Sequence, residues 1–177
     1  MEELVTTPIG KEAGTASNGS GGAPDVELAS RNWRVYLAGE IHTQWRDEIR
    51  DGARERELPI EFTAPVVRHS LSDDIGVKIL GREEEDFWRD NKATGINALR
   101  TRVHIGDSDV VVVRFDDRHK ELNVAFDAGY AVALGKPLIA LHESELDHAL
   151  KDIDRAAIAV TRSPEQVVRI LRYVIVA

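Results

Sequence analysis

The segment DVVVVRFDDRHKELNVAFDAGYAVALGKPLIALH, residues 109–142, decides the fold class. Its first part, 109–115, is a continuous apolar run of the kind found in parallel strands that are covered on both faces. A helical stretch follows and ends at Gly135, just before a proline. A second apolar run, 137–142, completes a strand–helix–strand unit. Such a unit favours a right-handed crossover and a parallel sheet.

The same alternation continues in both directions along the chain. Residues 66–85 interrupt it as a polar stretch, which we expect to be a long loop with about one helical turn. We therefore predict a flavodoxin-like α/β fold: a doubly wound, five-stranded parallel sheet in the order 2-1-3-4-5 with helices on both faces. The predicted strands are 33–39, 59–65, 109–115, 137–142 and 156–161, and the predicted helices are 43–57, 87–109, 121–136, 143–154 and 163–177.

Composition divides the chain into two parts. Residues 1–30 are rich in Gly, Ser, Thr and Ala and lack an apolar period, so we expect a disordered tail. The remaining residues, 31–177, are enough for one domain with a full hydrophobic core. Capping residues mark the start of the first and last helices of this domain. Thr43 is the expected N-cap of the first helix, and Ser163 followed by Pro164 opens the last.

Charge and cysteine content exclude several classes of function. The net charge of −8 argues against binding a nucleic-acid polymer or an anionic membrane, although a small nucleoside or nucleotide could still bind. The chain has no cysteine, which excludes disulfides, thiol catalysis and cysteine-ligated zinc. It has no apolar run long enough to cross a bilayer and no secretory signal, so we expect a cytoplasmic protein.

In a doubly wound sheet, ligands bind beyond the carboxyl ends of the strands where the strand order reverses. This rule selects three loops: 38–46, 65–74 and 115–127. The first offers Gly39, Glu40, His42 and Arg46 beside a helix N-terminus, which suits an anionic or hydroxyl-rich ligand. It lacks the GxxxxGK and GxGxxG nucleotide signatures, and a solvated turn is the alternative interpretation.

The second loop contains His69 and several hydroxyl and carboxyl groups. None of them has the fixed helical spacing of a metal-ligand pair, so we expect a rim or lid over a ligand, without a metal or other cofactor. On the helix before the third strand, Asn97 and Arg100 are three residues apart and can share one face.

Asp127 is the most informative single residue. It lies near the start of a helix among the small residues Ala125, Ala128 and Gly129. From the field of the helix N-terminus alone, this carboxylate should stay ionised. An ionised carboxylate in a small, partly dry pocket suits attack on an anomeric carbon or stabilisation of a sugar cation. The alternative is an ordinary acidic residue in the first turns of a helix.

Several motifs together resemble the YtoQ family, which is grouped with the nucleoside 2-deoxyribosyltransferase-like proteins. They are VYLAGEIHTQWRDEI (35–49), RHSLSDDIGVKILG (68–81), NALRTRVHIGDSDVVVVRF (97–115) and NVAFDAGYAVALGKPLIALH (123–142). The resemblance covers 33–175. It implies a flavodoxin-like domain, homo-oligomers, and cleavage of N-glycosidic bonds through a glycosyl-enzyme intermediate. Related enzymes transfer the deoxyribosyl group to another base or hydrolyse a nucleoside monophosphate.

Residue by residue, the resemblance is close, but it departs at the positions where the family has catalytic carboxylates. Residues 36–39 match a Y-L-A-G-P motif up to Glu40, which replaces the proline. In the second motif, F-E-[IL]-G-Y-A-x-A-L-G-K-P, Asp127 stands where the resemblance places a catalytic Glu. Thr101 occupies the place of a further carboxylate, and Glu121 replaces an Asp. The second-motif residues that match are Phe126, Gly129, Tyr130, Ala131 and Gly135 to Pro137.

Two functions remain open from the sequence. The first is an enzyme acting on the N-glycosidic bond of a nucleoside or nucleotide, with Asp127 as nucleophile or cation stabiliser and Glu40 or His42 handling the proton. The second is a nucleoside- or nucleotide-binding module without catalysis on the same scaffold. The expected substrate-binding residues are Tyr36, Gly39, Arg46, His69, Asn97, Arg100 and Asn123.

Overall fold

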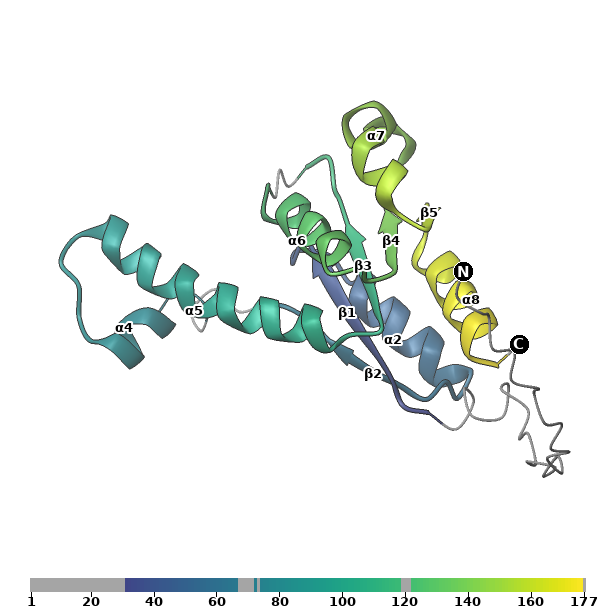
Figure 1. Ribbon diagram of the computed structural model, residues 1–177, viewed down its shortest axis with the longest axis horizontal. Helices are drawn as coiled ribbons and strands as arrows, with labels where there is room; N and C mark the ends of the chain where they lie inside the picture. Colours follow the sequence, from purple (N-terminus) through teal and green to yellow (C-terminus); the bar gives the residue numbers. More distant parts are fainter. Residues whose placement is uncertain (1–30, 67–71, 73, 119–121, 177) are drawn as a thin grey trace, which may run out of the picture.

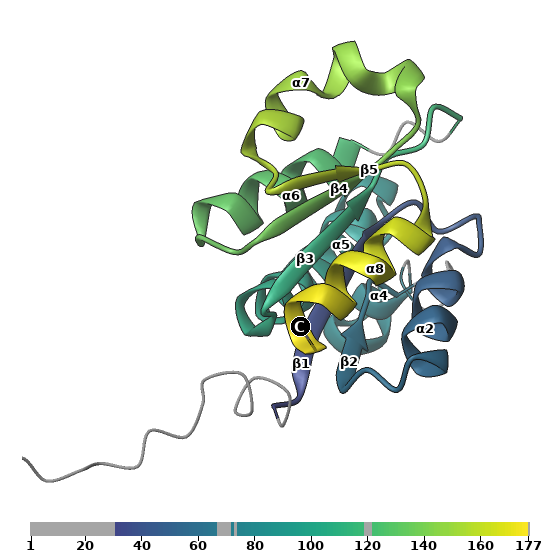
Figure 2. The same ribbon diagram turned by 90° about the vertical axis from the view of Figure 1, so that its right-hand side faces the viewer.

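The predicted topology is confirmed. A computed structural model of the chain describes residues 31–66, 72, 74–118 and 122–176. It contains a five-stranded sheet in the order β2-β1-β3-β4-β5, with every neighbouring pair parallel (Figures 1 and 2). The strands are β1 (Trp33–Gly39), β2 (Ile60–Thr63), β3 (Val110–Arg114), β4 (Leu138–Leu141) and β5 (Ala159–Thr161).

Helices cover both faces of the sheet, as predicted. Helices α2 and α8 pack on one face, and α5, α6 and α7 pack on the other (Figures 1 and 2). The helices are α2 (Trp45–Glu55), α4 (Ile75–Leu80), α5 (Asp86–Asp107), α6 (Leu122–Ala133), α7 (Asp147–Ala156) and α8 (Pro164–Val176), with a short 3-10 helix, η1 (Ser144–Leu146), before α7.

Each face has its own hydrophobic cluster because side chains alternate along the strands. On the α2 and α8 face, Val35 and Leu37 of β1 pack with Trp45 and Leu171. On the other face, neighbours on the same strands, such as Tyr36 and Ala38, pack with residues of α5 and α6. The central strands are therefore apolar on both sides, as the run at 109–115 predicted.

The β1–β3 pair is the point where strand order reverses. Its register pairs Gly39 with Arg114, so both strands end at the same level. The loops after β1 and β3 consequently leave the sheet side by side and diverge to opposite sides. Between them and the flanking helices lies the space where a doubly wound sheet binds ligands.

Helix α5 extends far beyond the sheet, which the sequence pattern did not anticipate. Its C-terminal end is anchored: Ile105 is fully buried, and Lys136 Nζ donates hydrogen bonds to the carbonyls of Gly106 (2.5 Å) and Ser108 (2.9 Å). Its N-terminal half projects outward with α4 packed against it (Figure 1). We call this projection, residues 74–93, the arm.

Close packing holds the arm together. A Cβ at Gly76 would lie 2.5 Å from the backbone nitrogen of Ala93, so only glycine lets α4 approach α5 this closely. Lys92 Nζ lies 2.6 Å from a carboxylate oxygen of Glu83. The stretch that was expected to be mainly loop therefore contains a helix of six residues, α4, that is fixed to its neighbour.

Two helix N-caps test the local predictions. Ser163 is confirmed, since its Oγ accepts a hydrogen bond from the Gln166 amide. The predicted N-cap of α2 was wrong: Gln44 takes that position, and the Thr43 hydroxyl donates a hydrogen bond to Glu40 instead. Within the described ranges, no helix combines the length and apolar character that crossing a bilayer requires. The predicted tail, residues 1–30, lies outside the described residues.

Candidate functional site

A pocket of about 960 Å³ opens between α5 and α6, at the carboxyl ends of β1 and β3. Four segments contribute to it: the end of β1, the segment after β2, the middle of α5 and the first turns of α6. Its lining residues include Gly39, Ile41, Pro65, Val66, Ser72, Asp90, Ala93, Thr94, Asn97, Ala98, Thr101, Arg102, Leu122, Asn123, Val124, Phe126, Asp127 and Tyr130. The pocket therefore lies where the strand order predicts a ligand site.

Asp127 lines this pocket from the second turn of α6. Burial raises the pKa of its carboxyl group from 3.8 to about 6. The sequence had suggested a carboxylate kept ionised by the helix N-terminus. That field weakens beyond the first turn, and desolvation outweighs it here. Asp127 is thus a carboxylate that is ionised at neutral pH but able to take up a proton slightly below it.

Tyr36 and Thr101 lie beside this carboxylate. Tyr36 is fully buried in β1, and its hydroxyl is 3.4 Å from Thr101 Oγ1. Burial is the main reason that the pKa of Tyr36 rises to about 12, and the charge of Asp127 adds to the rise. The phenol therefore stays protonated and can donate a hydrogen bond. Thr101 lines the pocket, where it presents a hydroxyl group.

Asn97 and Arg100 connect α5 to the segment after β2. Asn97 lines the pocket, and its Nδ2 donates to the carbonyl (3.2 Å) and hydroxyl (3.0 Å) of Ser72. Arg100 Nη1 donates to the carbonyl of Ala64 at 2.7 Å and is not part of the lining. The predicted shared face exists, and both residues use it to hold the segment that forms one side of the pocket.

Gly39 ends β1 in a conformation that favours glycine, with φ of 140°. A Cβ there would lie 2.6 Å from the carbonyl oxygen of Arg114. The two strand ends can therefore approach each other closely, and Gly39 lines the pocket with bare backbone.

Glu40 is buried and organises the turn after β1. Its Oε2 accepts hydrogen bonds from the amides of His42 (2.6 Å) and Thr43 (3.0 Å), and Arg114 Nε lies 3.3 Å from Oε1. Burial alone would raise the pKa of Glu40, but these hydrogen bonds and the Arg114 charge outweigh it and leave the pKa lowered. Glu40 is outside the pocket lining. Its carboxylate thus stays ionised and is occupied by the loop.

Arg46 is also buried, at 4% exposure, and it serves the same turn. Its guanidinium donates hydrogen bonds to three backbone carbonyls, those of Leu37 (3.0 Å), Gly39 (2.7 Å) and Glu40 (2.5 Å). These carbonyls lie at and just before the turn after β1, so the guanidinium satisfies backbone acceptors there. Arg46 therefore shapes the turn from behind, because none of its atoms lines the pocket.

The remaining predicted residues are distributed unevenly. Asn123 lines the pocket from α6. The side chain of His42 is exposed next to the lining residue Ile41, although His42 itself is not part of the lining. His69 lies outside the described residues. The pocket thus brings together Asp127, Gly39, Asn97 and Asn123 from the predicted set, with Tyr36 close to Thr101 at one side.

The sequence singles out Asn97 and Thr101 but does not predict that α5 forms a continuous polar wall of the pocket. Asp90, Thr94, Asn97 and Thr101 are spaced four, three and four residues apart, so they form one polar stripe along the helix and all line the pocket. That spacing was visible in the sequence. The apolar residues Leu99 and Val103 have the spacing of a core-facing helix face and indicate a different side of α5.

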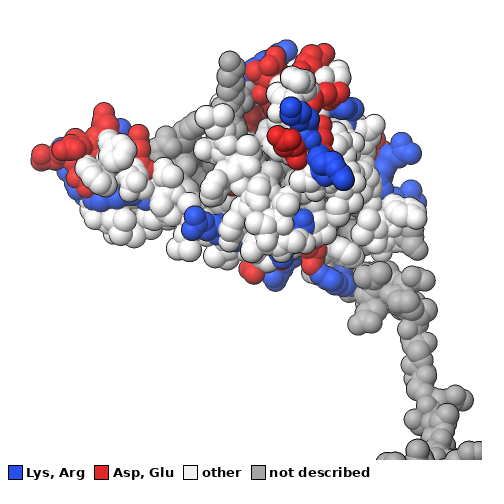
Figure 3. Space-filling model, turned by 45° about the horizontal axis from the view of Figure 1, so that its top comes forward, with Lys and Arg blue, Asp and Glu red and all other residues white. Residues whose placement is uncertain are grey.

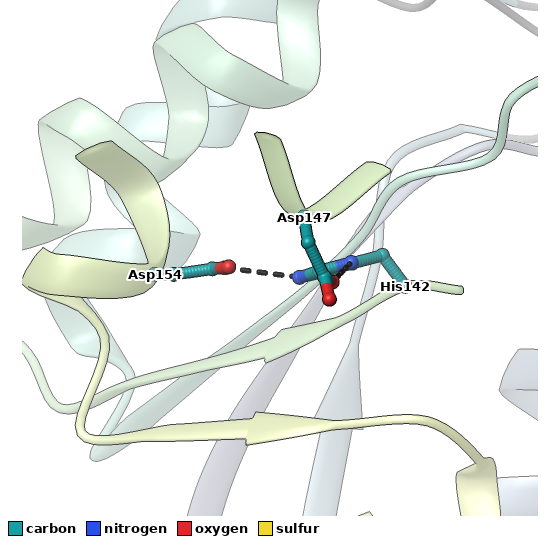
Figure 4. Close-up of side chains that lie close together, drawn as sticks. All are labelled: His142, Asp147 and Asp154. Atoms are coloured by element: carbon teal, nitrogen blue, oxygen red, sulfur yellow. Dashed lines mark hydrogen bonds and ion pairs between the residues drawn. The ribbon is translucent and has the colours of Figure 1, made fainter. Parts of the chain in front are cut away.

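A second polar cluster lies at the ends of β4 and β5, outside the pocket (Figure 4). His142 is fully buried, with Nε2 2.9 Å from Asp154 Oδ1 and Nδ1 2.9 Å from the Glu143 carbonyl oxygen. Asp147 Oδ1 lies 3.7 Å from Nδ1. The two carboxylates therefore approach different ring nitrogens, as Figure 4 shows, and are poorly placed to share one metal ion with the ring.

A protein cation already occupies this cluster. Arg162 Nη1 lies 2.6 Å from Asp147 Oδ1 and 3.1 Å from His142 Nδ1. The arrangement ties α7 and the end of β5 to the end of β4. We interpret it as a structural clamp rather than a metal centre.

Taken together, the pocket offers a carboxylate with a raised pKa, amide and hydroxyl donors, and the backbone of Gly39. Hydroxyl and amide groups suit a polyhydroxylated ring, while the carboxylate could bond to, or stabilise, an electron-poor carbon of that ring.

Comparisons with known proteins identify the family and support the fold. The family model described as nucleoside 2-deoxyribosyltransferase YtoQ matches residues 36–175. The curated protein named uncharacterized protein YtoQ, from Bacillus subtilis (strain 168), is 40% identical over 139 residues, which span 78% of this chain and 94% of that protein.

Solved structures share the fold at lower identity. A 2-deoxyribosyltransferase from Bacillus psychrosaccharolyticus superposes with a TM-score of 0.50 at 17% identity, covering 76% of this chain and 90% of the other. A conserved protein from Enterococcus faecalis V583 superposes with a TM-score of 0.53, also at 17% identity, covering 81% and 99%. At these identities, the likeness concerns the arrangement of the chain.

Proposed function

The chain belongs to the YtoQ family of nucleoside 2-deoxyribosyltransferase-like proteins, and from that premise we propose that it cleaves or transfers at the N-glycosidic bond of a nucleoside or nucleotide. The observation that carries this proposal is the position of Asp127. Its carboxyl group lines a pocket at the switch point of the sheet, and burial raises its pKa to about 6.

In the proposed reaction, an Asp127 oxygen attacks the anomeric carbon of the sugar. The bond from that carbon to the base nitrogen breaks, and its electron pair leaves with the base, which takes up a proton. The resulting glycosyl ester is then attacked by a nitrogen of a second base, or by water, which loses a proton to the group that protonated the first base, and the Asp127 carboxylate is released. If the sugar cation forms before the bond to Asp127, the same carboxylate stabilises it electrostatically.

The proton for the leaving base must come from another group. Of the two candidates, Glu40 is bound by two backbone amides and Arg114, and its pKa is lowered. A strongly bound carboxylate is a poor proton donor. We therefore favour His42, whose exposed side chain follows the lining residue Ile41.

The other expected residues fall into two groups in this proposal. Gly39, Asn97 and Asn123 line the pocket and would contact the sugar or base, with the Tyr36 hydroxyl as a further donor. Arg46 and Arg100 would act indirectly, since their hydrogen bonds hold backbone segments around the pocket. His69 remains a proposed rim residue on the second loop.

A binding module without catalysis is the second candidate. Two observations favour it: Glu40 is engaged by its own loop, and Thr101 offers a hydroxyl where the resemblance implies a carboxylate. Such a protein would retain the pocket and its affinity for nucleosides, but would not exchange the base.

The remaining parts of the proposal concern partners and setting. The partner is a small nucleoside or nucleotide rather than a nucleic-acid polymer, since the net charge is −8. We place the reaction in the cytoplasm, which the absence of cysteine suits. We also propose a homo-oligomer, because large apolar side chains such as Leu99 (65% exposed), Phe126 (63%) and Tyr173 (75%) lie on the surface.

The test is base exchange with a panel of deoxynucleosides and a free acceptor base, followed by chromatography, with binding measured in parallel. We expect turnover by the wild type and a loss of roughly 10³-fold in Asp127→Ala, with nucleoside binding retained. Asp152→Ala, which changes an exposed carboxylate on α7, is the matched control and should keep full activity.

The outcomes separate the two candidates. Nucleoside binding without turnover in the wild type, unchanged in Asp127→Ala, would reject the enzyme and support the binding module. Absence of both binding and turnover would reject both proposals.

A further inference from the structure

The tip of the arm combines apolar and acidic side chains. Ile79 and Leu80 at the end of α4 are 61% and 58% exposed, and Phe87 and Trp88 at the start of α5 are 68% and 50% exposed. The two aromatic rings pack edge to face at 5.1 Å. Large apolar side chains gathered at the end of a projection commonly mark an interaction site.

The same tip is strongly acidic. Residues 82–90 contain five carboxylates and two arginines, which gives them a net charge of −3. Glu84 and Glu85 are exposed and form no ion pair with any described residue. Figure 3 shows acidic side chains gathered at the end of the arm.

A groove of complementary character lies between β5 and α8. It encloses about 720 Å³ and is lined by apolar side chains together with two arginines, and no acidic residue contributes to its described lining. Arg169 and Arg172 are exposed and, among the described residues, have no ion-pair partner. The apolar lining comes from Val160, Ile170, Tyr173 and Val176.

The arm cannot fill its own groove. The arm and α8 lie at opposite ends of the molecule's longest axis, with the sheet between them (Figure 1). Gly76 and the Glu83–Lys92 ion pair keep α4 fixed on α5, so the arm is a rigid projection rather than a loop that could fold back. An arm seated in a groove must therefore come from another molecule.

We propose that the arm of one copy docks in the β5–α8 groove of a second copy. Glu84 and Glu85 would meet Arg169 and Arg172, while Phe87 and Trp88 would cover the apolar lining. Charge complementarity selects this occupant: the chain as a whole is acidic, so two copies repel unless an acidic tip meets a basic surface.

The symmetry of the assembly follows from this contact. If two copies exchange arms, one two-fold axis satisfies both contacts and a dimer closes. If each arm enters the groove of the next copy, the contact is head-to-tail: it forms a ring where the rotation between copies closes and an open filament where it does not. The inference specifies surfaces for the proposed homo-oligomer, and it is independent of the proposed reaction.

Charge exchange tests the docking directly. The arm variant Glu84→Arg/Glu85→Arg and the groove variant Arg169→Glu/Arg172→Glu should each weaken association by roughly tenfold or more, measured as mass by light scattering during size-exclusion chromatography. The combined four-residue variant should recover the wild-type mass. Glu48→Arg/Glu55→Arg on α2 makes the same change of charge as the arm variant at another place and should leave the mass unchanged. Circular dichroism would check that every variant is folded.

Each other result overturns the docking. A monomeric wild type at micromolar concentration rejects it together with the homo-oligomer. An oligomer that tolerates both variants as well as it tolerates the α2 control rejects the docking alone, and so does a combined variant that fails to recover. Loss of association on deleting residues 1–30, with arm and groove intact, would assign the groove to the N-terminal segment instead. Base-exchange activity, measured on the same samples, reports separately on the proposed function.

Discussion

A methyl group at Gly39 would lie 2.6 Å from the carbonyl oxygen of Arg114, so the ends of β1 and β3 meet in a space that only glycine permits. Gly39 also has φ of 140°, which side chains disfavour. The close approach places bare backbone in the wall of the pocket, next to the turn that Glu40 and Arg46 hold together.

Gly39→Ala should therefore destabilise the protein by about 2–3 kcal/mol and weaken nucleoside binding, because either the strand end or Arg114 must move. Gly95→Ala is the matched control, since a methyl group at Gly95 in α5 meets nothing within 4 Å. That change should stabilise the helix by about 0.5–1 kcal/mol. Denaturant unfolding measures both. Equal effects of the two substitutions would contradict this account.

The pH dependence of turnover should report on Asp127. A nucleophile must be ionised, and burial raises the pKa of this carboxyl group to about 6. We expect kcat/KM to fall by about tenfold per pH unit as the pH drops below that pKa. Base exchange followed from about pH 8 down to pH 5 gives the profile. A profile that stays flat down to about pH 4 would show that another group carries the reaction.

Asp127 should also reduce stability at neutral pH. Its pKa is about 6 in the folded protein against 3.8 as the ordinary value, so the folded state loses stability as pH rises between these values. Replacing it by Asn should raise the free energy of unfolding by about 1 kcal/mol at neutral pH, a figure reduced for partial solvent access. This gain in the free energy of unfolding should vanish below the ordinary pKa of 3.8. A gain independent of pH would mean that it comes from packing.

The clamp around His142 predicts a stability effect away from the pocket. Asp154→Ala removes the carboxylate that lies 2.9 Å from the buried His142 Nε2 and should destabilise the protein by about 1–3 kcal/mol. Asp152→Ala on the same helix removes an exposed carboxylate and should change stability by less than about 0.5 kcal/mol. Thermal unfolding followed by circular dichroism compares the two. Similar losses in both variants would show that His142 does not depend on Asp154.

The sheet order and the position of Asp127 could be predicted because both depend on local pattern. The apolar run at 109–115 and the Gly135 stop define a strand–helix–strand unit without knowledge of distant contacts. The crossover rule then gives the topology, and the switch point gives the pocket.

Other features depend on partners that sequence spacing does not reveal. Leu99 and Val103 follow the helical period of core residues, yet they are 65% and 52% exposed, because Thr101 and Ile105 turn a different face of α5 toward the sheet. Thr43 is a residue type that favours the N-cap position, but its hydroxyl donates a hydrogen bond to the Glu40 carboxylate instead. The raised pKa of Asp127 reflects burial by the folded chain, which a single-residue argument from the helix dipole could not include.

Helix α5 resembles a cantilever: its C-terminal end is anchored to the sheet, and its N-terminal end projects freely. Ile105 and Lys136 fix its C-terminal end, the pocket occupies its middle, and the arm is its free end. A helix of this length spans about 33 Å, so tilting it by about 5° at the fixed end moves Asn97 by about 1 Å. Displacements of that size change catalytic rates by about 10²-fold. A tilt of α5 about its anchored end would therefore change the distance between the two walls of the pocket.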